Sequence, residues 1–431
     1  MRRLSLFLAL SLVWLCSYGR IPDERSLSYY VETAKRNSPL IKDYRNRAAL
    51  QQIELQRLDA MYRHSRLELD GDWLFVPVIS KEGGRTAFKW NAQDGMDCYG
   101  YDLGESSGHL HAGVTWTQPL MGSRSYRVAR EQAKISCEMA DNGIRMEEHE
   151  LERSVTEQYL LCLLDKIQIE FSDTVASLLE RQAGIVRKLA AGGMARQSDL
   201  RLILIEQQVN AESRIGSVQS YNAHLMDLNL LCGIADGQNA VLADLCLETE
   251  PPRHAGSSLF TEQFRLDSLN TAAALRSFNL RYKPSLDLFV SGGMQTGAFG
   301  GWCRHFGCSA GLTFTWTIFD GRQKRYKEHQ AQLQKNTIRT YRTHAEYRRE
   351  MRISQCLSEL AGYDERSRSL NQQLAEYEDV LSSYEKEMRA GQISVLDNIM
   401  VLRNKIQTER DLQLLRTNRQ LVIAAYNYWN W

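Results

Sequence analysis

The chain repeats its own sequence at a shift of 198 residues, and this repeat limits the folds open to it. Without a gap, seven residues recur as the same type: Gly113, Thr115, Thr117, Arg124, Arg127, Gln132 and Ala133 fall on Gly311, Thr313, Thr315, Arg322, Arg325, Gln330 and Ala331. The same shift carries Gly193 onto Gly391 and Asp199 onto Asp397, far downstream. Because one shift serves both places, we expect two structurally equivalent halves with long helices of equal length.

The helices are predicted in two proline-free tracts, residues 120–250 and 285–431. Proline breaks helix interiors, and its absence over such distances permits very long helices. In the first tract, apolar residues recur at spacings near three and four among charged ones, which is typical of coiled-coil packing. They include Ile135, Met139, Ile144, Leu151, Val155, Leu160, Leu163, Ile167, Val175, Leu178 and Val186. A helix over residues 123–190 would be roughly 100 Å long.

Strands are predicted where apolar and polar residues alternate, in residues 114–117 and 312–318. The partner strands are about residues 66–78 and 285–294, related by a second shift of 219 residues that matches Leu67 and Leu69 to Leu286 and Leu288. The difference between the two shifts indicates a longer Gly-rich insertion in the first half, residues 81–108. The sequence thus predicts four strands in two hairpins. Their alternation suits the lipid and lumen faces of a membrane barrel, and equally the faces of a soluble sandwich.

The first residues have the layout of a secretory signal peptide. Arg2 and Arg3 precede an apolar run at residues 4–15, and residues 17–19 offer small side chains at the −3 and −1 positions of a cleavage site. Lipid attachment to Cys16 is an alternative, although the bulky Leu15 stands where lipoprotein signals carry a small residue. The apolar run is too short for an ordinary transmembrane helix. We therefore expect an exported protein.

The remaining sequence has no long charge-free apolar stretch, so we expect no membrane-spanning helix. If the exported chain is embedded in a membrane, it must be as a β-barrel, because lipid offers no partners to unpaired backbone groups. Four strands cannot close a barrel with a usable lumen, and open edges in lipid are not tolerated. Three chains would pool twelve strands, which makes a trimer the natural solution.

Composition and motifs argue against an enzyme and against a nucleic-acid partner. Lys and Arg (53) nearly balance Asp and Glu (52), whereas a nucleic-acid binder usually has a net basic face. The sequence holds no P-loop, HExxH, GxSxG or dinucleotide fingerprint, so we assign no catalytic residue and no cofactor. No CxxC pair supports a metal site. His109 and His111 should share the polar strand face with Thr115 and Thr117, as ordinary lumen residues rather than metal ligands.

The cysteines do not resemble a disulfide framework. Cys137, Cys162, Cys232 and Cys356 lie in predicted helices, where we interpret them as buried free thiols. Cys303 and Cys308 sit in a Gly-rich turn and could pair with each other, or either of them with Cys98.

Together these features resemble the TolC-type outer-membrane efflux proteins (outer-membrane factors), over nearly the whole chain after the signal peptide. Residues 26–34 and 37–40 (NSPL) are similar to the first helix of that family. Residues 117–122 (TQPLMG) and 317–321 (TIFDG) resemble its strand-to-helix junctions, and residues 282–286 (YKPSL) its entry into the third strand. Each motif alone is weak, and the order of the motifs together with the repeat carries the resemblance.

The resemblance implies an α+β membrane protein with a two-fold internal repeat. Four transmembrane strands per chain would complete a trimeric 12-stranded barrel, and long α-helical coiled-coil hairpins would extend into the periplasm. The implied domains are the signal peptide (1–19), an N-terminal periplasmic helix (20–65), the first β-hairpin (66–120), the first long helical hairpin (121–250), a linker and helix (251–283), the second β-hairpin (284–319) and the second long helical hairpin (320–431).

The site residues implied by the family lie at the two turns between long helices. The turns contain Gly193, Met194, Ala195 and Arg196 in the first half and Gly391, Gln392, Ile393 and Ser394 in the second. Glycine permits the positive φ that ends a helix, and Ser394 with Asp397 resembles a capping box. In the family these tips dock on an adaptor protein, and we expect residues 194, 195, 392 and 393 to be exposed.

Two carboxylates match family residues that ring the pore just inside the tip. Asp199 and Asp397 are therefore candidates for the periplasmic gate, with helix capping as the alternative role of Asp397. A further family carboxylate would fall at Met400, and Ile393 stands where some members carry a basic partner. The closed state here should depend more on packing than on ion pairs.

The predicted function is that of the outer-membrane exit duct of a tripartite efflux or secretion system. Its expected partners are two further copies of the chain, outer-membrane lipid, a periplasmic adaptor and an inner-membrane pump. The alternatives are a periplasmic coiled-coil adaptor or a structural scaffold without a pore. An adaptor normally has one helical hairpin rather than two equivalent ones, and a scaffold has no need of alternating strands.

Overall fold

The computed structural model describes residues 24–73, 78–82, 85–89, 110–193, 195–235, 241–252, 258–296, 306–389 and 395–431. The predicted signal peptide, Cys16, Cys98, Cys303 and His109 lie outside these ranges. The chain divides into two compact units, one of residues 46–141 and 263–342, the other of residues 1–45, 142–262 and 343–431. No helix within the described ranges is long and apolar enough to cross a membrane.

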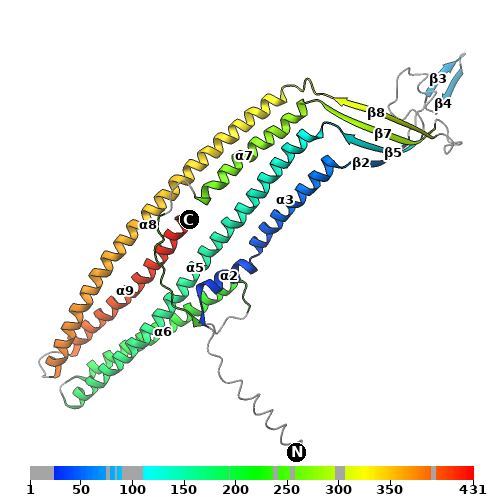
Figure 1. The fold of residues 1–431 in the computed structure, drawn as a ribbon. Coiled ribbons are helices and arrows are strands. Elements are labelled where there is room, and N and C mark those ends of the chain that lie inside the picture. Colours follow the sequence, from blue (N-terminus) through cyan, green and yellow to red (C-terminus); the bar gives the residue numbers. More distant parts are fainter. Residues whose placement is uncertain are drawn as a thin grey trace, which may run out of the picture. The chain divides into compact units, whose positions relative to one another are not determined.

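The first unit contains a four-stranded antiparallel sheet. Its strands are β2 (Arg66–Trp73), β5 (Leu110–Pro119), β7 (Ser285–Thr296) and β8 (Phe306–Thr315), in the order β2-β5-β7-β8 (Figure 1). Arg66 pairs with Thr117 in the first hairpin, and Ser285 pairs with Thr315 in the second. These two pairs are related by the shifts of 219 and 198 residues. The prediction of two equivalent hairpins is therefore confirmed down to the strand register.

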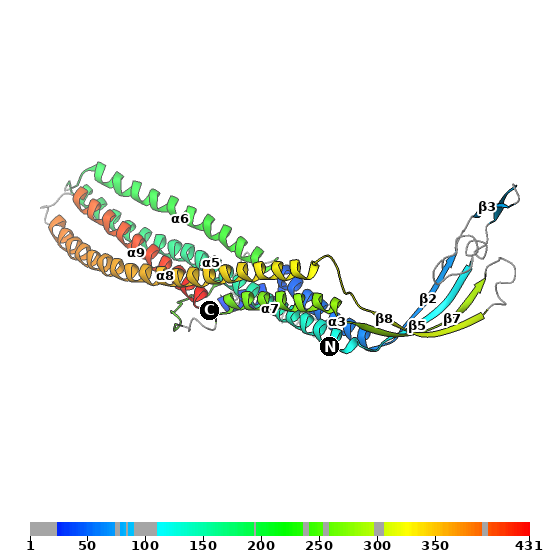
Figure 2. The ribbon, with the colours of Figure 1, turned by 90° about the horizontal axis from the view of Figure 1, so that it is seen from above.

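The long helices also obey the repeat. Helix α5 (Gly122–Ala191) and helix α8 (Gln323–Arg389) end at positions 198 residues apart. The returning helices α6 (Gln197–Cys232) and α9 (Val395–Trp429) begin 198 residues apart. The prediction of long helices in two equivalent halves is confirmed. In the second unit these four helices run alongside one another as two hairpins (Figure 2).

Several predicted boundaries were wrong. Strand β8 ends at Thr315, short of the predicted residue 318, because the chain soon turns through positive φ at Gly321 (71°) and Arg322 (67°). Strand β2 is described up to Trp73, and residues 74–77 of the predicted strand lie outside the described ranges. An unforeseen hairpin of β3 (Val78–Glu82) and β4 (Arg85–Lys89) begins before the predicted insertion. The single helix expected within residues 20–65 is broken at Ser38 into α2 (Leu27–Asn37) and α3 (Pro39–Arg63).

The remaining elements join the two halves. Helix α7 (Leu259–Asn279) and a short 3-10 turn (Leu280–Tyr282) precede β7. Strands β1 (Glu24–Arg25) and β6 (Val241–Leu242) form a short parallel pair in the second unit. The hydroxyl of Tyr159 lies 2.6 Å from the carbonyl oxygen of Ala243 and 3.0 Å from that of Arg25, so it binds the segments on both sides of this pair.

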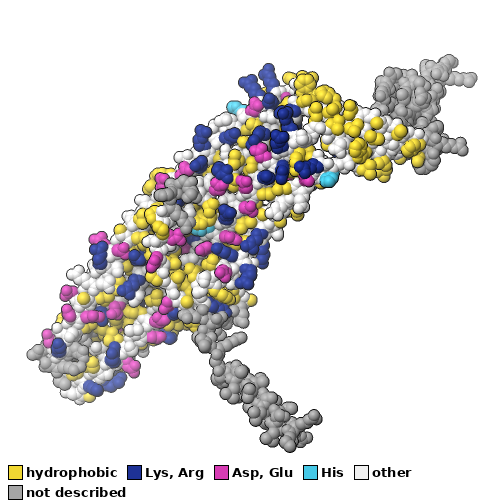
Figure 3. Space-filling view, viewed as in Figure 1, with side chains coloured by type: hydrophobic (Ala, Val, Ile, Leu, Met, Phe, Trp, Pro, Cys, Tyr) yellow, Lys and Arg dark blue, Asp and Glu magenta, His cyan; other side chains and the backbone are white. Residues whose placement is uncertain are grey.

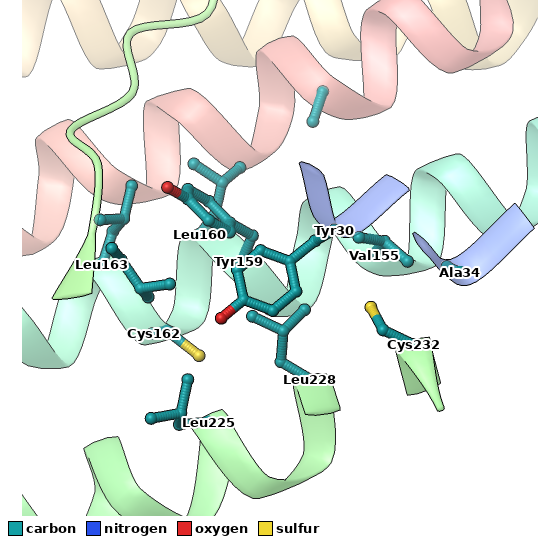
Figure 4. Packing of buried hydrophobic residues seen from close by; sticks show 12 residues of the cluster. Tyr30, Ala34, Val155, Tyr159, Leu160, Cys162, Leu163, Leu225, Leu228 and Cys232 are labelled. Atoms are coloured by element: carbon teal, nitrogen blue, oxygen red, sulfur yellow. The ribbon is translucent and has the colours of Figure 1, made fainter. Parts of the chain in front are cut away.

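The main core of the second unit surrounds Tyr159 and Tyr30, whose rings lie 5.8 Å apart (Figure 4). Helices α2, α5, α6 and α9 all contribute buried side chains: Ala34, Val155, Leu160, Cys162, Leu163, Leu225, Leu228, Cys232, Leu242 and Ala424 complete the cluster. Within this cluster, each fully buried valine or leucine side chain contributes about 1.5–3 kcal/mol. The thiols of Cys162, Cys232 and Cys356 are buried and free, as predicted, while free Cys137 is half-buried. Cys308 is a free, exposed thiol among the described residues, and its predicted partners Cys98 and Cys303 lie outside them.

An aromatic cluster fixes the end of α9 to the middle of α5. The imidazole of His149 is stacked between the rings of Tyr428 (centroids 4.7 Å apart) and Trp431 (3.9 Å), and its Nε2 lies 3.0 Å from the carbonyl oxygen of Tyr428. The hydroxyl of Tyr428 donates to Glu150 at 2.7 Å. Burial lowers the pKa of His149, against the opposing effect of the Tyr428 carbonyl and of Glu150 and Glu152.

This stack should weaken on acidification. Because the pKa of His149 is lower in the folded state, its stabilising contribution is present above about pH 6.5, the unfolded value, and falls as the pH drops below it. Hydrogen exchange of residues 424–431 should therefore accelerate between pH 7.5 and 5.5, after correction for intrinsic exchange. In His149→Phe the ring stays but cannot be protonated, and the excess acceleration should vanish. An equal pH effect in both proteins would contradict this role.

Candidate functional site

The four-stranded sheet separates apolar from polar side chains. The register places one set on a common face, here called the apolar face: Leu67, Leu69, Val114, Trp116, Leu286, Leu288, Val290, Leu312 and Phe314. The opposite, polar face carries Glu68, Asp70, Thr115, Thr117, Ser285, Asp287, Ser291, Ser309, Thr313 and Thr315. The apolar face is not a core, because Leu69 is 83% exposed and Phe314 63% exposed. In water such a surface is unfavourable unless something covers it.

The polar face has its own side-chain contacts across three strands. The Thr115 hydroxyl donates to Asp70 Oδ1 at 3.0 Å, and Thr115 Oγ1 lies 3.3 Å from Ser291 Oγ. Phe289 is an exception on this face, and its ring covers Gly311, where an added Cβ would approach to 2.8 Å. His111 takes a place in β5 opposite Asp72, at the register of the polar face.

The sheet is open at both edges. Among the described strands, β2 pairs only with β5, and β8 pairs only with β7. Each outer edge therefore presents backbone N–H and C=O groups to whatever surrounds it, which is a template for pairing with another chain.

The first helix–helix turn has the predicted geometry. Gly193 adopts φ 76° after the end of α5, and its N–H donates to the carbonyl of Ala190 at 3.1 Å. Helix α6 then begins with a reciprocal cap: the backbone N–H of Arg196 donates to Asp199 Oδ2 at 3.1 Å, and the N–H of Asp199 donates to the Arg196 carbonyl at 3.1 Å. Asp199 is therefore a capping residue at the start of α6.

The other predicted tip residues give a mixed result. Ala195 is half-buried rather than exposed, because it packs against a cluster that includes Val186, Ile203 and Val395. Asp397 is exposed in the first turn of α9, at the position equivalent to Asp199. Met194, Gly391, Gln392, Ile393 and Ser394 lie outside the described residues, so the predicted cap between Ser394 and Asp397 stays a prediction.

The structure also reveals exposed apolar side chains that the sequence analysis did not identify. On α6, Leu202, Ile205 and Val209 are 37%, 51% and 54% exposed, at helical spacing. On α9, Leu396 and Met400 are 44% and 56% exposed. Met400, where the family would carry a further carboxylate, thus presents an apolar side chain to its surroundings. These residues are apolar in the sequence, but their spacing alone could not show which apolar side chains face the core and which face outward.

No protein-family model matches the chain, and no curated protein matches it in sequence. Solved structures do match its fold. The transmembrane channel protein CusC aligns with 95% of this chain and 92% of its own length, with a TM-score of 0.72 and 13% sequence identity. The fold is that of the TolC-type outer-membrane channels. The outer membrane protein VceC from Vibrio cholerae aligns over 94% and 95% of the two chains (TM-score 0.71, 13% identity), and the outer-membrane channel OprN over 96% and 93% (0.72, 12%).

At 12–13% identity the likeness concerns the fold, and the side chains of this chain must support any further conclusion. Helical hairpins in two equivalent halves and a four-stranded antiparallel sheet, as the resemblance implied, are confirmed.

The turn at Gly193 offers a direct test with an internal control. An added Cβ at Gly193 meets nothing within 4 Å, so Gly193→Ala should cost about 1 kcal/mol through the positive φ alone. Gly184 also has open space but lies inside α5, so Gly184→Ala should stabilise the helix by about 0.5–1 kcal/mol. Hydrogen exchange of residues 185–200 should therefore accelerate in the first variant and slow in the second. The same direction in both would contradict the assigned turn.

Proposed function

We propose that this chain is a subunit of an outer-membrane channel, the exit duct of a tripartite efflux or secretion system. The observation that carries this proposal is the exposed apolar face of the sheet. It suits contact with lipid, while the hydroxyls and carboxylates of the opposite face suit a water-filled lumen. The likeness to outer-membrane channels supports the same conclusion.

In this proposal three copies complete a 12-stranded barrel. The open edges β2 and β8 cannot be left unpaired in lipid, since each unsatisfied backbone group costs several kcal/mol there. Strand directions alternate across the four strands, so β8 of one copy meets β2 of the next antiparallel, and the pattern continues around a ring. The exposed apolar side chains of α6 and α9 supply further surface for contacts between copies.

The internal repeat specifies how these edges would align. Within one chain, Thr117 of β5 pairs with Phe289 of β7. The 198-residue shift takes Thr117 to Thr315, and the 219-residue shift takes Phe289 to Asp70. If the copies repeat this join, Thr315 lies opposite Asp70 of the next copy and Thr313 opposite Asp72. This register keeps polar residues beside polar ones and places Trp316 beside Leu69 on the apolar face, which a one-residue slip would reverse.

Paired cysteines test both the trimer and the register. Thr315→Cys with Asp70→Cys, in a Cys308→Ser background, should form disulfides between copies and give a covalent trimer on a non-reducing gel. The control pairs join Thr315→Cys with Glu68→Cys or with Asp72→Cys, two positions that lie on the same face of β2 but are displaced along the strand. These pairs should crosslink poorly, because a disulfide needs Cβ atoms about 3.5–4.5 Å apart.

A disulfide within one chain cannot explain such crosslinks. Strands β5 and β7 lie between β2 and β8, and neighbouring strands are about 4.8 Å apart, so the two cysteines of one chain are too far apart to bond. Preferential crosslinking of a displaced pair would overturn the register while keeping the assembly. A stable monomer that crosslinks at none of the pairs would overturn the barrel.

We place the long helical hairpins in the periplasm, with their turns docking on an adaptor that links the duct to an inner-membrane pump. The docking segments are residues 193–196 and 391–394, as the sequence suggests. Asp397 is the better gate candidate, because it is exposed, while the Asp199 carboxylate already caps α6. Neighbouring exposed Met400 and Leu396 would narrow the pore by apolar packing.

A charge at each turn tests docking. Met194→Asp and Ile393→Asp should leave trimer yield unchanged but abolish export, because a buried unpaired charge costs a few kcal/mol at each of three symmetric sites. Gln372→Asp adds the same charge at an exposed position of α8 and serves as the matched control. The readout is export or drug tolerance in a strain that depends on this channel. Normal transport in both turn variants would exclude the turns as the docking surface.

The alternative is a periplasmic adaptor or scaffold without a pore. Either would leave the apolar face of the sheet in water, which disfavours both. Membrane fractionation separates the possibilities, since a channel partitions with the outer membrane and requires detergent.

A further inference from the structure

A dense group of cations lies where the strands β7 and β8 join their helices. Arg281 and Lys283 precede β7, and Arg322, Lys324, Arg325 and Lys327 follow β8; all six are exposed. We call these six residues the cationic collar. Figure 3 shows Lys and Arg side chains gathered at this end of α7 and α8, directly beside hydrophobic side chains of the strand region. The collar and the sheet belong to the same compact unit.

Carboxylates are fewer than cations around the collar. Residues 280–328 contain three acids, Asp287, Asp320 and Glu328, against the six collar cations. Asp320 accepts a hydrogen bond from the Tyr282 hydroxyl, and Asp287 lies on the polar face of the sheet. Lys324 and Arg281 contact aromatic rings instead, with 5.9 Å to the centroid of Tyr282 and 5.3 Å to that of Phe278. None of the ion pairs found among the described residues includes a collar cation.

The internal repeat places arginines at the same level in the first half. Arg124 and Arg127, near the start of α5, are the equivalents of Arg322 and Arg325 and are also exposed. Both halves therefore carry a pair of exposed arginines at the junction between the sheet and the long helix that follows it. A need for solubility alone would not require the same residue type at the same two positions.

At the end of β8, apolar and aromatic residues separate the sheet from the four collar cations that follow. Trp316, Ile318 and Phe319 are 53%, 81% and 81% exposed, and Tyr326 within the collar is 64% exposed. The order along the chain is thus apolar strand, exposed aromatic and aliphatic residues, then cations. Membrane surfaces present the same order of environments, namely hydrocarbon, interface and charged head groups.

We propose that the cationic collar binds the phosphate groups of anionic phospholipids in the leaflet that faces the helices. This inference rests on the proposed function, because the collar meets head groups only if the apolar face lies in lipid. The planar guanidinium groups of Arg322 and Arg325 match phosphate oxygens in pairs, and each cation near a membrane surface adds about fivefold in affinity for anionic lipid. The collar would select phosphatidylglycerol-type over zwitterionic lipids and fix the height of the barrel in the membrane.

The test compares two variants of the full chain that lose the same charge, one at the start of α8 and one farther along it. The collar variant is Arg322→Gln, Arg325→Gln and Lys327→Gln. The control is Arg352→Gln, Arg366→Gln and Lys386→Gln, all exposed positions of α8 in the other unit. Purified protein in detergent is titrated with phosphatidylglycerol or phosphatidylethanolamine, and bound lipids are counted by native mass spectrometry.

Wild type and control should prefer phosphatidylglycerol, and the collar variant should bind it at least about tenfold more weakly. Three results would overturn the inference. These are an equal loss of phosphatidylglycerol binding in both variants, unchanged binding in the collar variant, and displacement of the lipid by an equal concentration of inorganic phosphate. Membrane fractionation and subunit stoichiometry of the same wild-type preparation distinguish a failure of the collar inference from a failure of the proposed function. A membrane-borne trimer without lipid preference overturns the collar alone, whereas a soluble monomer overturns the proposed function and the collar with it.

Discussion

The open edges of the four-stranded sheet are the constraint from which the proposed architecture follows. A sheet with one exposed apolar face and two unpaired edges is stable neither in water nor, as a single copy, in lipid. Association of copies edge to edge satisfies the backbone of β2 and β8 and keeps both faces continuous. In the proposed trimer, the outward apolar residues of the long helices, such as Ile205 and Val209, are candidates for contacts between copies.

The internal repeat specifies how the edges of two copies would pair. One chain already contains an example of the hairpin-to-hairpin pairing required between copies, namely the pairing of β5 with β7. Because both hairpins share a register, copying that pairing preserves the separation of apolar from polar side chains. The repeat extends to the helix ends and to the paired arginines of the two strand-to-helix junctions. The insertion with the β3–β4 hairpin is the main departure from this symmetry.

The sequence predicted best those features that depend on local pattern. Proline-free periodic tracts located the helices, and Gly193 located the turn between α5 and α6. The parallel pair β1–β6 was missed because it is two residues long on each side and depends on Tyr159 and Lys166, which bind its carbonyl groups from α5. The stack of His149 with Tyr428 and Trp431 joins residues hundreds of positions apart, so no local pattern could indicate it. Alternation at residues 316–318 suggested strand, but the left-handed turn at Gly321 and Arg322 ends the sheet earlier. For Asp199 the sequence indicated only a place at the gate, and the structure adds a cap, because its carboxylate accepts a hydrogen bond from the backbone N–H of Arg196.

The central claim is that copies of this chain enclose a pore, and electrical recording tests it most directly. Purified protein added to a planar lipid bilayer should produce discrete, uniform current steps, small in the wild type if the periplasmic end is closed at rest. Asp397→Ala should change the step size or the cation preference, since Asp397 is the exposed carboxylate near the turn. Protein that inserts stably yet passes no steps, in either form and at any voltage, would contradict the account.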